Sequence, residues 1–170
     1  MQTRLEMTRN TDEILTGWYA GEIGGGALFS RLATRAEPAI ARKWRSLARV
    51  ESAVAARLAA VLESRQIPVP KVANAGSRAL QRSDAVAGKS WTETMHWLQS
   101  LAAAALREMQ ADAAALPEEL AATGSMVVSH EEALLAFAQA ELAGAGEHSL
   151  QPLEAFLDSV KAPYGRDERD

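Results

Sequence analysis

The segment Leu47-Ala48-Arg49-Val50-Glu51-Ser52-Ala53-Val54 stands midway along a helix-forming run from about residue 39 to residue 66. Apolar residues in this run recur at steps of three and four, at positions 40, 44, 47, 54 and 58, which is the spacing of one helix face. Glu51 occupies the same face. Because an unpaired carboxylate is costly to bury, Glu51 is the most informative residue of the chain.

The preceding run, from about residue 12 to residue 35, repeats this pattern with Glu22 on its apolar stripe. Glu37-Pro38 forms a short link between the two runs, so the two predicted helices should be antiparallel neighbours. Glu22 lies about 15 residues before this link and Glu51 about 14 after it, so at ~1.5 Å per residue both lie ~21 Å from the turn. We expect the two glutamates to face each other.

Four glycines lie inside the first predicted helix, where each costs up to about 1 kcal/mol relative to alanine. They are Gly21, Gly24, Gly25 and Gly26. Close approach of a neighbouring helix or a local bulge would explain them, and so would room for a ligand. Thr11 or Asp12 is the expected N-cap of this helix.

Two further long helices are predicted, over about residues 90–116 and 126–143. Ser90 is suited to cap the first, and Pro117 closes it. We expect the turn between them at residues 122–125, and a short closing helix at 150–160. Residues 67–89 begin with two prolines, could hold a helical turn or two at 77–86, and are long enough to run back along the molecule. The tail, residues 161–170, is expected to be disordered.

Composition narrows the class of protein. The chain has 170 residues, 48% of them apolar, no cysteine and a net charge of −4. One domain is expected, and disulfides and thiolate metal sites are excluded. No apolar run is long enough for a membrane span, and no hydrophobic signal segment is present, so we expect a cytoplasmic protein without membrane contact. The acidic balance gives no reason to expect nucleic acid as a partner.

The expected architecture is therefore all-α: an up-down four-helix bundle with a long crossover between the second and third helices, plus a short C-terminal helix. The pattern Glu22, Leu32-Ala33 and Leu47-Ala48-x-x-Glu51-x-x-Val54 resembles the first helix pair of the ferritin-like, rubrerythrin-type superfamily. The resemblance implies a di-iron centre, held in that family by a glutamate on the first helix and a Glu-x-x-His on the second.

The chain departs from the family pattern at both histidines. The first falls on Val54, and Gly144 stands three residues after Glu141, the glutamate expected on the fourth helix. With the third helix parallel to the second, the level of the two core glutamates falls near Glu108 and Glu141. The candidate metal ligands are then Glu22, Glu51, Glu108 and Glu141. Oxygen ligands alone suit hard ions such as magnesium or manganese.

The sequence contains two other groups of acids and histidines. His130-Glu131-Glu132 would open the fourth helix, where acids are ordinary dipole chemistry, or would form a site at the bundle end with His130 and Glu131 as alternative ligands. Glu93-x-x-His96 lies ~15 Å from the core glutamates and is interpreted as a surface pair.

Two functions remain open. The first is a helical bundle that has lost the di-iron site and needs no cofactor. It would bind a partner or a small hydrophobic ligand in its core, or self-associate as a homodimer, and its core acids would be protonated or paired with Arg49 or Arg57. The second is a carboxylate-bridged oxidoreductase with a pair of iron or manganese ions. The missing histidines favour the first.

Overall fold

The computed structural model describes residues 9–161, which form six α-helices and two short 3-10 helices. The elements are α1 (Thr11–Thr34), α2 (Pro38–Ser64), α3 (Ala75–Asp84), α4 (Trp91–Ala114), η1 (Glu118–Leu120), α5 (Ala121–Leu142), η2 (Gly146–Leu150) and α6 (Gln151–Lys161). This part of the chain contains no strand. The all-α prediction is confirmed. Apart from Lys161 at the end of α6, the expected disordered tail lies outside the described residues.

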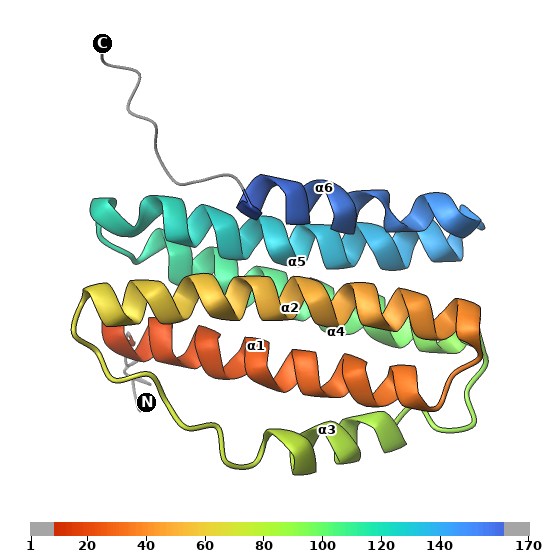
Figure 1. The fold of residues 1–170 in the computed structure, drawn as a ribbon. Coiled ribbons are helices and arrows are strands. Elements are labelled where there is room, and N and C mark those ends of the chain that lie inside the picture. Colours follow the sequence, from red (N-terminus) through yellow and green to blue (C-terminus); the bar gives the residue numbers. More distant parts are fainter. Residues whose placement is uncertain (1–8, 162–170) are drawn as a thin grey trace, which may run out of the picture.

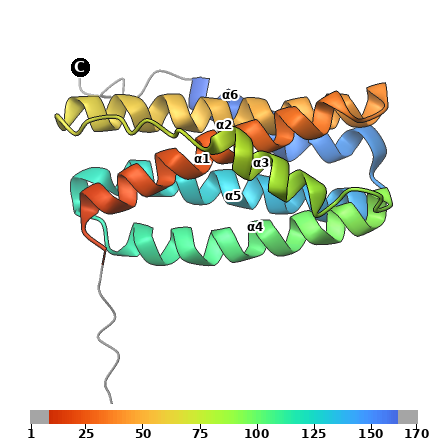
Figure 2. The same ribbon diagram turned by 90° about the horizontal axis from the view of Figure 1, so that it is seen from below.

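The four longest helices run along one common axis (Figure 1). Helix α1 packs along α2, and α4 packs along α5. The connection from α2 to α4 runs from one end of the molecule to the other, and its helix α3 packs on α1 (Figures 1 and 2). Helix α4 therefore runs in the same direction as α2. The short helix α6 packs on α5 and α2.

The N-terminal ends of α1, α2 and α4 each begin with a residue suited to start a helix. Asn10, rather than Thr11 or Asp12, caps α1, because its side chain accepts from the backbone N–H of Glu13 while the Glu13 carboxylate accepts from the backbone N–H of Asn10. Ser90 caps α4 in the same way, as predicted. Pro38 opens α2, where its missing N–H has no partner to lose.

Helix α5 begins five residues earlier than predicted, and the expected turn at 122–125 is helical instead. The reversal occurs over Pro117 and η1, and no side-chain cap marks the start of α5. Gly124 serves packing rather than a turn, because a Cβ there would lie 3.1 Å from the Cβ of Ala113 on α4. The smallest side chain is what lets α4 and α5 approach closely.

The core runs the length of the four long helices. Its fully buried apolar side chains include Leu15, Trp18, Leu47, Leu58, Leu98, Val127 and Phe137. Burying each such side chain stabilises the fold by about 1.5–3 kcal/mol relative to leaving it exposed. Trp44 stacks on Phe29 at 5.7 Å and meets Trp91 edge-on at 5.3 Å, which links α1, α2 and α4. Within residues 9–161, no helix combines the length and apolar character that a membrane crossing requires.

Candidate functional site

Four buried titratable side chains meet in the core. Glu22 comes from α1, Glu51 from α2, and His130 and Glu131 from α5. His130 Nδ1 lies 3.5 Å from Glu22 Oε1, and His130 Nε2 lies 3.3 Å from Glu51 Oε1. Glu131 Oε1 lies 3.9 Å from His130 Nδ1. We call these four residues the acid–histidine cluster. The expectation that Glu22 and Glu51 face each other is met.

A glycine makes the space that the cluster needs. A Cβ on Gly25 would overlap the Glu51 carboxylate, at 2.6 Å from its Cδ. A Cβ on the neighbouring Gly24 would meet nothing within 4 Å, and one on Gly26 would make an ordinary contact with the Glu51 Cβ at 3.6 Å. Of these three glycines, Gly25 is the one whose missing side chain admits Glu51 between α1 and α2.

Three polar atoms of the cluster lack hydrogen-bond partners although they are buried. They are Glu22 Oε2, Glu131 Oε2 and His130 Nδ1. Buried polar atoms in native proteins nearly always have a hydrogen-bond partner, so three unpaired atoms in one cluster require a physical explanation. One ligand atom from each of Glu22, Glu51 and His130 can be chosen so that all three lie within 4.8 Å of one another. Carboxylate and imidazole donors at such distances fit a divalent metal ion.

The electrostatics of the cluster are strongly coupled. Burial raises the pKa of Glu22 well above its ordinary value, with the charge of His130 opposing and that of Glu51 adding to the shift. Burial likewise raises the pKa of Glu131 to about 7. Burial lowers the pKa of His130, but the charges of Glu22 and Glu51 outweigh it and raise that pKa to about 10. The protein by itself therefore holds protons here that a metal ion would displace.

A cavity of about 360 Å³ opens beside the cluster, between α1 and α4. Glu22, Glu51 and Glu131 line it, whereas His130 does not and is only 1% exposed. The carboxylates thus border a space that a small molecule can enter. The His130 imidazole lies on their buried side, away from the cavity.

Glu108 lies outside the cluster. Its side chain is 64% exposed and pairs with Arg9, which also bonds Asp112. Glu108 lines the cavity near its rim, but no donor from α4 joins the acid–histidine cluster among the described residues. At this level α4 contributes small residues such as Ala102 and Ala105.

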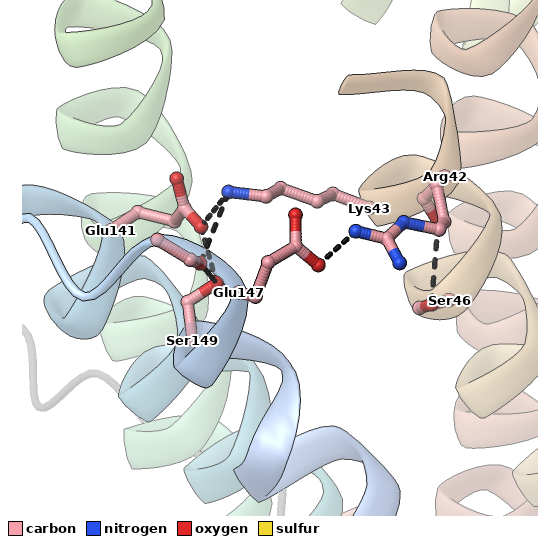
Figure 3. Close-up of polar contacts among 7 residues, drawn as sticks. Arg42, Lys43, Ser46, Glu141, Glu147 and Ser149 are labelled. Carbon is pink, nitrogen blue, oxygen red and sulfur yellow. Dashed lines mark hydrogen bonds and ion pairs between the residues drawn. The ribbon is translucent and has the colours of Figure 1, made fainter. Parts of the chain in front are cut away.

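Glu141 also lies elsewhere, near the end of α5. It follows Glu131 by about ten residues, or ~15 Å of helix. Its carboxylate accepts from the ammonium of Lys43, the hydroxyl of Ser149 and, at 2.6 Å, Trp91 Nε1. Figure 3 shows Lys43 and Ser149 converging on Glu141, with the exposed Arg42–Glu147 pair alongside.

This network joins α2, α4, α5 and η2 at one end of the molecule. The Lys43 ammonium also donates to the carbonyl of Gly146 and lies 5.8 Å from the ring centre of Trp91. Burial raises the pKa of Glu141, but hydrogen bonds from Lys43, Ser149 and Trp91 outweigh it, and the net shift is downward. Glu141 is thus a satisfied structural carboxylate. We call it, with Lys43, Trp91 and Ser149, the end clasp.

The sequence interpretation named His130 as an alternative metal ligand but placed it wrongly along its helix. Because α5 starts at Ala121, His130 and Glu131 lie in the middle of the helix and not in its first turn. His130 follows Val127 by three residues and precedes Leu134 by four, so it lies on the buried stripe. This spacing could have placed His130 in the core from the sequence alone, but the predicted helix start was too late for the spacing to be recognised.

Two further predictions concerned the cation that pairs with Glu51 and the position of the Glu93-x-x-His96 pair. The cation beside Glu51 is His130, since Arg49 is exposed and Arg57 donates to the carbonyl of Val160. Glu93 belongs to the cap of α4 and His96 is exposed, so the Glu93-x-x-His96 pair lies on the surface as predicted.

Comparison of the chain with protein-family models, with curated proteins and with solved structures found no match. The assignment of a function therefore depends on the acid–histidine cluster and the cavity beside it.

Proposed function

We propose that the acid–histidine cluster binds a divalent metal ion, with Glu22, Glu51 and His130 as ligands and Glu131 beside them. The observation that carries this proposal is the convergence of these buried donors, within 4.8 Å for the first three, with Glu22 Oε2, Glu131 Oε2 and His130 Nδ1 left without hydrogen-bond partners. A buried carboxylate is stable when it is paired or coordinates a metal. Binding of a dication would neutralise two carboxylates that otherwise repel each other.

The mixed set of two carboxylates and one imidazole favours a metal such as iron or zinc. Imidazole suits iron or zinc, whereas manganese and magnesium prefer carboxylate, carbonyl and water oxygens. His130 supplies the imidazole that the sequence interpretation did not find at Val54 or Gly144. Three helices contribute donors and α4 contributes none, so we propose one ion instead of the pair that the family resemblance implies.

Within this proposal the protein's residues have separate tasks. Glu22 and Glu51 hold the ion at the cavity wall, and His130 holds it from the buried side. Gly25 keeps the space for the Glu51 carboxylate. Such an ion would supply Lewis-acid or one-electron chemistry to a molecule in the cavity. Glu131 lines the same cavity and lies beside His130, so its carboxylate would be placed to exchange a proton with a molecule there.

We also propose that the fold is a ferritin-like four-helix bundle. The shared axis of α1, α2, α4 and α5, the parallel direction of α2 and α4, and the long connection carrying α3 support this. The position of Glu22 opposite Glu51 on the first two helices supports it further.

Elemental analysis after loading with ferrous iron, manganese or zinc tests the metal proposal. We expect about one ion per chain in the parent protein, and a large loss in Glu22→Gln and Glu51→Gln. Glu108→Gln is the matched control, because Glu108 is exposed and lies outside the cluster, and it should keep the ion. A folded parent protein that retains none of the three metals would overturn the proposal.

One observation favours a second candidate. His130 with a pKa of about 10 can itself serve as the cation for Glu22 and Glu51. The cluster would then be a structural ion network in a metal-free bundle that acts by binding a ligand or by self-association as a dimer. Among the described residues, Leu80 is the one large apolar side chain that is strongly exposed, at 40%. Light scattering on the purified chain would measure the dimer directly.

A further inference from the structure

Helix α6 covers only part of the groove between α2 and α5. The carbonyl of Gly146, in η2 just before α6, accepts from Lys43 near the start of α2. At the other end of α6, the carbonyl of Val160 accepts from Arg57. Helix α6 therefore runs in the same direction as α2, and it ends before α2 does (Figure 1). The groove between α2 and α5 continues beyond the end of α6.

The part of the groove beyond α6 has a volume of about 500 Å³. Val61 of α2 and the buried Met126 of α5 supply apolar side chains to it. Arg57 lies at the end nearest α6, and at the other end Arg65 pairs with Glu119 at 3.8 Å. The eight residues of helix from Arg57 to Arg65 measure ~12 Å. We call this stretch, from Arg57 to the Arg65–Glu119 pair, the distal groove.

The apolar stripe of α6 follows the same groove between α2 and α5. The buried residues of this stripe are Leu153, Phe156, Leu157 and Val160. A further step of four along the sequence leads from Val160 to Tyr164. The next large side chain that fits the stripe is therefore an aromatic one, and it follows the part of the groove that α6 covers.

The segment after α6 has the length that the distal groove requires. Pro163 disfavours continuation of the helix, so the sequence predicts an extended backbone for residues 162–164. At ~3.3 Å per residue, three extended residues reach ~10 Å past Lys161, which is close to the ~12 Å of the groove. Residues 165–170 have no large apolar side chain. The groove also exceeds the ~150 Å³ that accommodates benzene in an engineered protein cavity, so it has room for the Tyr164 ring.

We propose that the distal groove is a docking site for residues 162–164 of this chain, with the ring of Tyr164 packed against Val61 and Met126. The segment is tethered at the end of α6, so docking is an intramolecular event with an effective concentration on the order of millimolar. The proposal is independent of the acid–histidine cluster and of metal binding. It restricts the disorder expected from the sequence to residues 165–170.

Introduced thiols can report the docking, because the chain has no cysteine. Ala60→Cys places one thiol on the exposed edge of the distal groove, and Gly165→Cys places the other directly after Tyr164. In the full-length protein treated with oxidised glutathione, we expect a disulfide within one chain. Adding Tyr164→Ser should slow its formation about tenfold, because burial of a large aromatic side chain no longer favours the docked form.

Asp158→Cys, in place of Ala60→Cys, is the matched control. The Asp158 side chain is 77% exposed on α6, so a thiol there meets position 165 only when the segment leaves the groove. Tyr164→Ser should therefore speed this second disulfide while it slows the first, and Tyr164→Phe, which keeps the ring, should change neither rate. Equal effects of Tyr164→Ser on both disulfides would overturn the proposal. Disulfides formed mainly between two chains would also overturn it and would assign the groove to a second copy.

Limited digestion of the full-length protein with trypsin gives a second measurement. Trypsin can cut after Lys161, at the start of the docked segment, and after Arg166, beyond it. Docking should protect the first bond, since cleavage follows the population of the undocked form. Tyr164→Ser should raise the cleavage rate after Lys161 about tenfold and leave the rate after Arg166 nearly unchanged. If the rate after Lys161 is the same in the parent and in Tyr164→Ser, the segment does not dock.

Discussion

Gly25 of α1 and Glu51 of α2 fit together so closely that a Cβ on the glycine would lie 2.6 Å from the Glu51 Cδ. We predict that Gly25→Ala displaces the Glu51 carboxylate and lowers metal affinity at least about tenfold, or ~1.4 kcal/mol. Overpacking should also cost about 1–3 kcal/mol of unfolding free energy. Metal titration and denaturant unfolding measure the two effects.

Gly24→Ala and Gly26→Ala are the controls for that experiment, because a Cβ at either position is accommodated. Each should raise the unfolding free energy by up to about 1 kcal/mol through helix propensity and leave metal affinity unchanged. If all three alanine variants bind metal equally, the close fit between Gly25 and Glu51 has no role in the site.

His130 is the cation of the cluster in the metal-free protein. We predict that His130→Leu lowers the unfolding free energy of the chelator-treated protein by about 3 kcal/mol, because Glu22 and Glu51 lose their buried partner. Adding Glu22→Gln and Glu51→Gln should recover much of this loss. The exposed His148→Leu should change stability by less than about 0.5 kcal/mol. A triple variant as unstable as His130→Leu alone would show that the ion pairs do not matter.

The end clasp predicts a pH dependence. The pKa of Glu141 is lowered in the folded protein, so its contribution to stability is present above its ordinary pKa of 4.5 and is lost as pH falls through the lower folded value. At neutral pH, Glu141→Gln should destabilise the fold by about 3 kcal/mol, because Lys43 keeps a buried charge without its partner. The difference from the parent should shrink as the pH drops below 4.5.

Glu147→Gln is the matched control for the clasp. Glu147 pairs with Arg42, and both side chains are more than half exposed. Such a surface pair contributes about 0–1 kcal/mol, so the variant should unfold close to the parent at every pH. Equal losses in Glu141→Gln and Glu147→Gln would contradict the assignment of Glu141 as a buried partner of Lys43.

The contact between Gly124 and Ala113 predicts a packing effect. Gly124→Val should lower the unfolding free energy by about 1–3 kcal/mol, because its side chain would force α4 and α5 apart. Gly76→Val on α3 is the control, since a Cβ there would meet nothing within 4 Å. Thermal unfolding of both variants makes the comparison. Equal midpoints would show that the two helices are not held at that distance.

Local patterns were sufficient to predict the helical content, seven of the eight boundaries of the four long helices to within two residues, and the meeting of Glu22 with Glu51. The reason is physical. Helix periodicity, proline and capping residues act over a few positions, and a short link forces two helices side by side, so depth along each helix follows from residue counting. The same reasoning placed Glu93 and His96 on the surface.

The start of α5 could not be predicted in this way, and the error carried over to His130. Helix α5 begins without a side-chain cap, and Gly124 is explained by Ala113 on another helix. Because the predicted start of this helix was five residues too late, His130 fell in its first turn. The part of the helix expected to lie beside Glu22 and Glu51 shifted towards Glu141 for the same reason. The exposure of Glu108 and the pairing of Glu141 with Lys43 likewise depend on residues far away in the chain.

Short-range periodicity is thus enough to predict an all-α protein whose first two long helices each direct one glutamate into the core. Which side chains surround those glutamates depends on how the separate helices pack against one another. His130 and Glu131 come from a helix about 80 residues further on, and their meeting with Glu51 depends on the register between separate helices, which packing sets and no local pattern encodes.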